Sequence, residues 1–100
     1  MLHDSRLFRR NVWYLLGATR GGPMRAKIMH ALMDRPLNPN QLSEKLGVDY
    51  KTARHHLDVL KKHNWVTSSM DKYGELFFPA FTDEQNAVFA EIWAQIGKKL

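Results

Sequence analysis

Apolar residues recur along this chain with two different spacings. In most of it they return every three or four positions, the spacing that puts them on one face of an α-helix. This predicts helices within residues 1–20, 23–34, 39–46, 49–63 and 82–100. Two short β-rich runs, starting at Trp65 and ending at Pro79, flank a polar turn that contains Gly74, which predicts a hairpin over 66–79.

The residues between these segments are typical of helix ends. Asn38 with Gln41, and Thr82 with Gln85, have the spacing of capping boxes, and Asp49 is suited to cap the helix that follows it. Gly47 and Asn64 stand where helices end, and both tolerate the left-handed conformation that such ends often need. The boundaries of the middle helices are therefore well specified.

Composition and charge narrow the class of protein. The chain has 100 residues, of which 44% are hydrophobic and 25% charged, so a single globular domain over residues 1–100 is expected. There is no cysteine, and no apolar run is long enough to cross a membrane. The N-terminus lacks the apolar core of a signal peptide, so a soluble cytoplasmic protein without a membrane partner is expected.

The net charge of +5 is unevenly distributed. Residues 1–35 carry seven basic and two acidic groups, and residues 49–63 add a further excess of two basic groups. The last third of the chain is mildly acidic. This asymmetry is compatible with one face that meets a polyanion and another that meets protein, although +5 is also common among soluble proteins.

The segment 49–63 carries the most information. On a helical wheel, four polar side chains fall on one side: Lys51, Arg54, His55 and Asp58. The apolar side chains of Ala53, Leu57 and Leu60 fall on the opposite side. The short helix before it ends at Leu46-Gly47-Val48, so two helices meet at a tight turn, as in a helix-turn-helix.

These residues resemble the winged helix-turn-helix family, most closely the small ArsR-like regulators of archaea and bacteria. The resemblance covers residues 21–80 and rests on Leu42 to Val48, on the Thr52 to Leu60 run, and on Trp65-Val66 at the start of the hairpin. It implies a mainly α fold with about five helices and a small antiparallel wing of two or three strands. It also implies that helix 49–63 enters the major groove of DNA, that the wing 66–79 lies beside it, and that the terminal helices form a dimer.

The residue chemistry suits such contacts. Arg54 is expected to pair with guanine and His55 to reach a base edge. Phosphate contacts are expected from Tyr50, Lys51, Thr52, Lys72 and Arg25. For each of them the alternative is a solvated helix or wing surface. His56 is expected to be a packed, hydrogen-bonded core histidine rather than a base reader.

The terminal helices are expected to join two subunits. Their apolar stripes comprise Leu7, Phe8, Val12 and Leu15 in the first helix and Val88, Phe89, Ile92, Trp93 and Ile96 in the last. The alternative is an antiparallel pair of the two helices within one chain, and both arrangements can coexist. The basic side chains of Arg6, Arg9 and Arg10 leave three roles open: flanking DNA, pairing with a partner subunit, or solvation.

Other chemistries fit poorly. The glycines of Gly17–Gly22 lack the Lys-Ser/Thr of a phosphate loop, and no residue set suggests catalysis, so neither enzyme activity nor a cofactor is expected. No metal site is expected either, because there are no cysteines and residues 82–100 contain no histidine.

The sequence therefore predicts a homodimeric regulator, more naturally a repressor, of an inverted-repeat operator in duplex DNA. It names no small-molecule effector, which would have to bind between subunits. A protein–protein module and a non-specific chromatin-like DNA binder remain alternatives.

Overall fold

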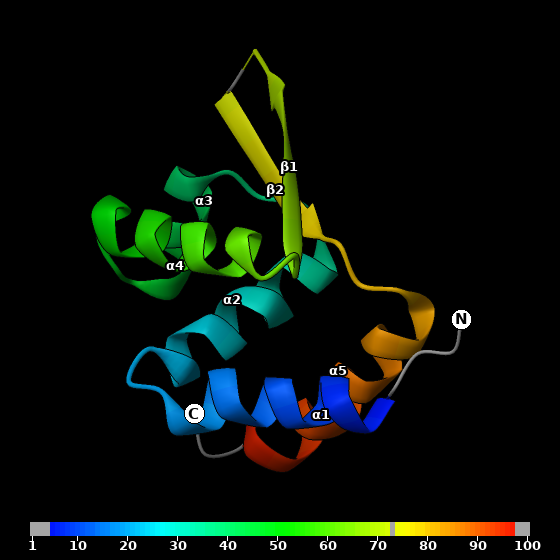
Figure 1. Cartoon of the computed structure of the whole chain (residues 1–100). Helices are drawn as coiled ribbons and strands as arrows, with labels where there is room; N and C mark the ends of the chain where they lie inside the picture. The colour runs from blue at the N-terminus through cyan, green and yellow to red at the C-terminus, as the bar shows by residue number, and fades with distance from the viewer. Residues whose placement is uncertain (1–4, 73, 98–100) are drawn as a thin grey trace.

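The fold consists of helices arranged around one helix, with a projecting hairpin (Figure 1). The structure is a computed structural model that describes residues 5–72 and 74–97. Its elements are, in chain order, α1 (Ser5–Val12), the π-helix η1 (Trp13–Ala18), α2 (Gly22–Asp34), α3 (Pro39–Leu46), α4 (Tyr50–Lys62), β1 (Val66–Asp71), β2 (Gly74–Pro79) and α5 (Asp83–Ile96). The predicted fold class, mainly helical with a small antiparallel wing, is confirmed. The outer ends of the predicted terminal helices, residues 1–4 and 98–100, lie outside the described residues.

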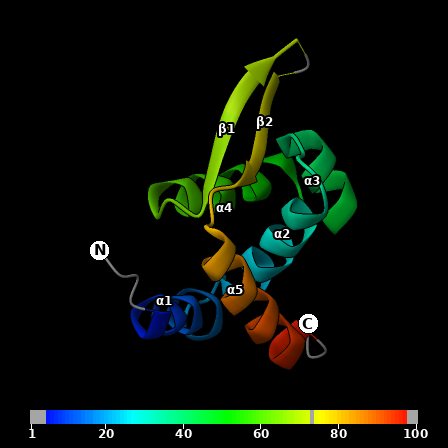
Figure 2. The same cartoon turned by 90° about the vertical axis from the view of Figure 1, so that its right-hand side faces the viewer.

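Helix α2 occupies the centre of the molecule. It contacts η1, α3, α4 and β2, and its side chains form much of the core. Figure 2 shows the hairpin extending away from the helices at one end of the molecule, with α1 and α5 at the opposite end. No helix in the described part of the chain combines the length and the apolar character needed to span a bilayer.

The helix ends follow the predicted capping residues. The side chain of Asn38 accepts a hydrogen bond from the Gln41 amide at 2.8 Å, and the Gln41 side-chain oxygen accepts one from the Asn38 amide. The capping box of Thr82 and Gln85 is formed in the same way at the start of α5. Gly47, with φ of 69°, ends α3 in the left-handed conformation. These local signals confirm the predicted boundaries of α3 and the predicted start of α5.

The hairpin is anchored to the segment that precedes α3. Strands β1 and β2 are antiparallel, with Val66 opposite Pro79 and Asp71 opposite Gly74. Leu37 adds a single bridge to Phe77, with backbone hydrogen bonds of 3.1 and 2.9 Å. The predicted sheet of two to three strands is therefore two strands and one bridge, and the bridge fixes the base of the wing.

The first helix differs from the uniform α-helix that the sequence predicts. After Val12 it continues as the π-helix η1, in which Leu15 and Leu16 are both buried. The carbonyl oxygen of Leu15 accepts hydrogen bonds from the Thr19 hydroxyl and from Arg25. Side chains thus satisfy the hydrogen-bonding capacity of a carbonyl group at this helix end. The spacing of apolar residues in the sequence does not predict these hydrogen bonds.

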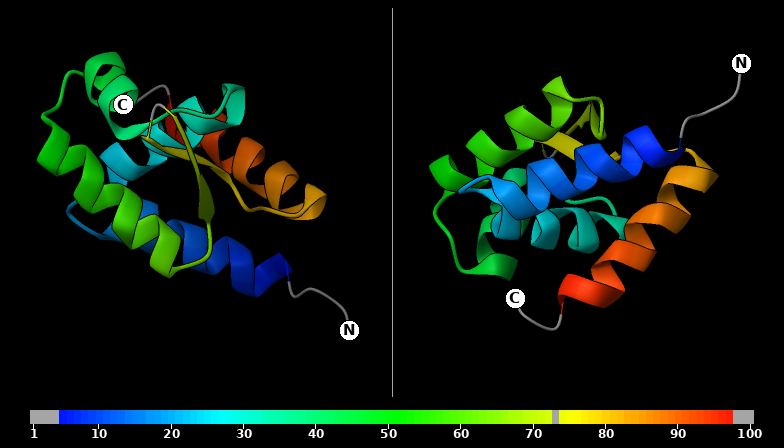
Figure 3. Two further views of the ribbon diagram at one scale, coloured as in Figure 1. Left: turned by 90° about the horizontal axis from the view of Figure 1, so that it is seen from above. Right: turned by 60° about the horizontal axis from the view of Figure 1, so that its bottom comes forward.

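Most apolar residues of the two terminal helices are buried in the core of a single chain. Five residues predicted to form a dimer interface are at most 7% exposed and belong to the core: Val12, Leu15, Val88, Phe89 and Ile92. For these five, the prediction of direct contact with a second subunit is wrong, because α1 and α5 pack on each other, η1 packs on α2, and α5 contacts α2. The two helices also run in the same general direction and diverge toward their C-terminal ends, so they are not the antiparallel pair that was the alternative (Figure 3).

The close packing of η1 on α2 gives a test of this arrangement. A Cβ atom at Gly22 would lie 1.9 Å from the Leu16 carbonyl oxygen, whereas a Cβ at Gly17 would lie 3.4 Å from the Trp13 ring. We expect Gly22→Ala to lower the free energy of unfolding by more than about 2 kcal/mol through this clash. Gly17→Ala is the matched control and should be neutral or stabilising, because alanine favours helix. Urea unfolding of both variants measures the difference, and equal effects would contradict the described contact.

Candidate nucleic-acid interface

Helix α4 has one buried and one exposed face. The side chains of Ala53, His56, Leu57 and Leu60 are buried against the core. Four residues predicted to touch DNA are exposed along the other side or at its N-terminal end: Tyr50, Lys51, Thr52 and His55. The structure therefore brings these four together on one helix surface.

The start of α4 is fixed by its cap. The Asp49 carboxylate accepts a hydrogen bond from the Thr52 amide at 2.8 Å. The hydrogen bond with the Thr52 side chain and then the bond from its amide lower the pKa of Asp49, so the cap engages Thr52 twice while Thr52 stays exposed. Because Gly47 ends α3 only two residues earlier, the turn between the two helices has little freedom.

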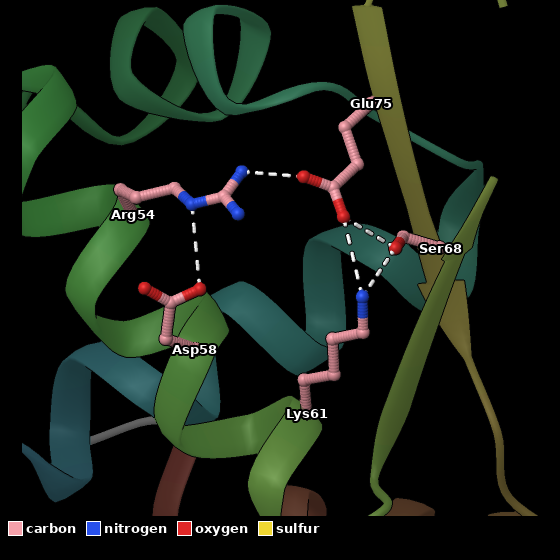
Figure 4. Close-up of polar contacts among 5 residues, drawn as sticks. All are labelled: Arg54, Asp58, Lys61, Ser68 and Glu75. Carbon is pink, nitrogen blue, oxygen red and sulfur yellow. Dashed lines mark hydrogen bonds and ion pairs between the residues drawn. The ribbon is translucent and has the colours of Figure 1, made fainter. Parts of the chain in front are cut away.

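Arg54 does not present a free guanidinium, contrary to the expectation of a guanine contact. Its Nη1 lies 2.6 Å from Glu75 Oε1 on β2, and its Nε lies 3.3 Å from Asp58 Oδ1 one helical turn further along α4 (Figure 4). The guanidinium also stacks over the Phe77 ring, with its central carbon 5.5 Å from the centroid. Two of its nitrogens are thus engaged with carboxylates, so Arg54 holds the wing in this structure, while its contact with guanine stays a prediction.

Glu75 is the centre of this contact between wing and helix. One carboxylate oxygen pairs with Arg54, and the other accepts from the Ser68 hydroxyl at 2.6 Å and from Lys61 Nζ at 3.3 Å (Figure 4). We call Arg54, Asp58, Lys61, Ser68 and Glu75 the Glu75 cluster. The hydrogen bond from Ser68 and then that from Arg54 lower the pKa of Glu75 to about 2.

Sequence reasoning missed Glu75, Lys61 and Ser68. The register of the hairpin contained part of the signal, because side chains alternate between the two faces of a strand. Met70 lies opposite Glu75, and Ser68 lies opposite Phe77, so these residues share the face on which Phe77 is buried. That this face meets α4 is a tertiary fact, which no local pattern could provide.

The other predicted wing residue, Lys72, is exposed and directly follows β1 at the tip of the hairpin. Glu75 is the second residue of β2, opposite Met70, so it also lies near this tip. A phosphate contact from Lys72 would be made at the tip of the hairpin.

Arg25 is not available for a phosphate contact, contrary to the prediction. Its side chain is 6% exposed, and burial lowers its pKa. Nη1 lies 3.3 Å from His56 Nδ1, and Nη2 donates to the Thr19 hydroxyl. His56 is itself 8% exposed, so the prediction of a packed, hydrogen-bonded core histidine is confirmed. The sequence shows that Arg25 lies near the start of a helix. It does not show that other elements bury Arg25 at that position.

A groove of about 440 Å³ lies between α2, α3 and α5 of a single chain. Its walls include Phe89 and Trp93, the His30 ring stacked 4.3 Å from Trp93, and the charged side chains of Asp34 and Lys45. The volume is that of a small-molecule site, so a pocket between subunits is not the only place where an effector would fit. In the described part of the chain, no group of three or more His, Asp or Glu side chains is arranged to hold a metal ion.

The Glu75 cluster makes a prediction about acid stability. Folding lowers the pKa of Glu75 to about 2 from an ordinary 4.5, so its stabilising contribution is complete above pH 4.5 and is lost as the pH falls toward 2. We expect Glu75→Gln to lower the free energy of unfolding at pH 7 by about 1 kcal/mol, after allowance for partial exposure, and to flatten its acid dependence. Glu44→Gln, at an exposed position on α3, is the control. Chemical unfolding between pH 2.5 and pH 7 measures both variants, and identical profiles for them would contradict the assignment.

Comparison with known proteins shows which proteins have a similar sequence or fold. Residues 22–68, from α2 to the first part of β1, match the sequence model described as bacterial regulatory protein, arsR family. No curated protein matches the sequence. Among solved structures, the transcriptional repressor BigR from Xylella fastidiosa superposes with a TM-score of 0.73 at 14% identity, over 96% of this chain and 90% of that one.

Two further structures have the same fold. The transcriptional regulator HlyU from Vibrio vulnificus has a TM-score of 0.70 at 17% identity, over 92% of each chain. A mutant MarR from E. coli, complexed with operator DNA, has a TM-score of 0.64 at 20% identity, over 95% of this chain and 69% of that one. The chain thus has a winged helix-turn-helix fold, and its residues 22–68 are similar to the arsR family of bacterial regulatory proteins.

Proposed function

We propose that this protein is a transcriptional regulator that binds duplex DNA sequence-specifically through the exposed face of α4. The observation that carries the proposal is the grouping of Tyr50, Lys51, Thr52 and His55 on one surface of a helix whose opposite face is fully packed. A helix presented in this way fits the major groove, and the neighbouring hairpin projects far enough to reach the backbone beside it (Figure 2).

Some charged side chains of this surface pair with each other, and others are proposed to contact DNA. Arg54 pairs with Glu75 and Asp58, and Lys61 pairs with Glu75, so the cations proposed to meet phosphates are the exposed Lys51 on α4 and Lys72 on the hairpin. Phosphate contacts from Tyr50, Thr52 and these lysines would set the register, and His55 would reach a base edge. Arg54 acts here through the wing, whose angle to α4 it fixes.

The regulator acts as a repressor in this proposal, by covering promoter DNA against the polymerase. The described residues form the winged helix-turn-helix fold and its terminal helices. Support comes from the similarity in fold to BigR, which is a transcriptional repressor, and to MarR in its complex with operator DNA.

The active form is a homodimer joined by the outer side of the first helix. Three large apolar side chains remain exposed there, namely Leu7 at 45%, Trp13 at 38% and Tyr14 at 67%. The side chains of Phe8, Trp93 and Ile96, also predicted for the interface, are partly buried and pack against the core. A two-fold axis through such an interface pairs two α4 helices, so the operator is an inverted repeat with half-sites about one turn of DNA apart.

Selection of bound sequences from random duplex DNA tests the function directly, with the bound fraction measured at about 50 and 200 mM salt. An enriched inverted repeat is the expected result. Binding that depends steeply on salt without an enriched sequence would replace specific regulation by non-specific coating of DNA. No binding at either salt concentration would contradict the proposal and favour a protein–protein module.

Lys51 provides a test of the α4 surface. Lys51→Ala should weaken binding to the selected operator by about 3- to 10-fold and reduce the slope of log affinity against log salt by about one, the signature of one lost phosphate contact. Lys27→Ala, on α2 beside the α5 groove, is the matched control and should change neither quantity. Fluorescence anisotropy over a salt series measures both variants, and an unchanged slope for Lys51→Ala would remove this residue from the interface.

Tyr14 provides a test of the dimer. Tyr14→Glu puts a charge into the apolar surface of η1, so the protein should become monomeric at micromolar concentration without loss of helical content. Met70→Glu is the control, because Met70 is 74% exposed on the hairpin, away from that surface. Light scattering after size exclusion gives the mass, and a Tyr14→Glu protein that remains dimeric would exclude this face as the interface.

A further inference from the structure

A buried polar contact links the recognition helix to the rest of the molecule. Arg25 on α2 and His56 on α4 are 6% and 8% exposed, and their Nη1 and Nδ1 atoms are 3.3 Å apart. The other terminal nitrogen of Arg25 donates to the Thr19 hydroxyl and lies 3.5 Å from the Leu15 carbonyl oxygen. One guanidinium therefore joins the end of η1 to the inner face of α4.

The contact requires a neutral imidazole. Arginine keeps its charge and has only donors, so His56 Nδ1 must contribute a lone pair and the ring proton must sit on Nε2. Among the described residues, no carboxylate pairs with Arg25 or His56. Protonation of His56 would place a second donor and a second positive charge opposite Arg25, with no acid to offset them.

Both side chains lie against Gly21. A Cβ atom at Gly21 would lie 2.5 Å from Arg25 Nη1 and 2.8 Å from His56 Cε1, so glycine at this position lets the two side chains meet. Arg25 Nε is also buried without a hydrogen-bond partner. The groups that face His56 are Arg25 from α2 and the His55 ring of its own helix, at 5.5 Å, and neither is negatively charged.

We propose that Arg25 and His56 are positioning residues for the recognition helix, and that protonation of His56 releases α4 from α2 and weakens operator binding. The proposal rests on the DNA-binding function proposed above. The contact lies beneath the helix surface that carries Lys51 and His55, so its loss moves the DNA-facing side chains without removing any of them.

The direction of the effect is distinctive. Burial, then Arg25 and then His55, lower the pKa of His56 below its ordinary 6.5. The stabilisation from this contact is therefore complete above pH 6.5 and is lost as the pH falls below that value. Acidification normally adds positive charge to exposed histidines and strengthens phosphate binding, so weaker binding in acid would point to a buried group.

The first experiment needs no DNA. The ring nitrogens of His56 are followed by NMR in a pH titration of the intact protein and of Arg25→Met, which keeps an unbranched side chain without the charge. We expect His56 to carry its proton on Nε2 and to titrate below 6.5 in the wild type, and its pKa to rise in Arg25→Met. A proton on Nδ1 at neutral pH, or the same pKa in both proteins, would overturn the coupling.

The second experiment measures affinity for the selected operator at pH 7.5 and pH 5.5 at one ionic strength. Wild-type affinity should fall by about tenfold or more, the factor that corresponds to one unit of pKa difference between the bound and released states of His56. In His56→Asn the side-chain oxygen takes the place of Nδ1 and does not titrate, so most of this loss should disappear. His63→Asn, at an exposed position at the end of the same helix, should retain it.

The outcomes separate the two proposals. Equal pH dependence in the wild type and His56→Asn, or tighter wild-type binding at pH 5.5, would overturn the positioning role. If Arg25→Met does not fold, His56→Asn alone decides the question, since it keeps an acceptor for Arg25. A protein that binds no duplex at either pH would overturn the function proposed above, while the titration of His56 would still decide the coupling.

Discussion

The burial of α2 on most of its sides is the constraint on which the rest of the structure depends. This helix is covered by η1, α3, α4 and β2, so most of its positions must be apolar or small. Each large apolar side chain that it buries contributes about 1.5 to 3 kcal/mol of transfer free energy, which a chain this small cannot obtain elsewhere. The same coverage traps Arg25, whose charged group then has to be satisfied by a helix end on one side and by His56 on the other.

The orientation of α4 follows from that packing. Leu57 and Leu60 are fully buried, and they fix which side of α4 faces outward before any polar contact is considered. Polar contacts then set finer details. Arg25 and His56 tie α4 to α2 from below, and the Glu75 cluster ties it to the hairpin from the side. The surface of α4 that we propose to face DNA is therefore supported by groups that do not themselves have to touch DNA.

The terminal helices show how one apolar stripe is divided between folding and association. Their inner residues complete the core of a single chain, and an ion pair of 2.9 Å between Arg9 and Glu91 spans the two helices. What remains for a second subunit is the outer side of α1 and η1, where aromatic side chains stay exposed. The fold is thus complete without a partner, while its surface keeps an apolar area of the kind that interfaces use.

The sequence by itself determined the order and boundaries of the helices, the hairpin, and the two faces of α4. These features depend on interactions within a few residues, such as the Asn38 and Gln41 capping box, the left-handed Gly47 and the spacing of Leu57 and Leu60. Tertiary structure alone decided what each charged side chain does. Arg54 and Arg25 looked equally suited to DNA, yet one pairs with Glu75 across 21 positions of sequence and the other with His56 across 31. The π-helical end of the first helix was likewise decided by side chains that approach from other elements. Local patterns specify backbone conformation and burial, but the partner of a charge depends on which distant elements pack beside it, and that is fixed only when the core closes.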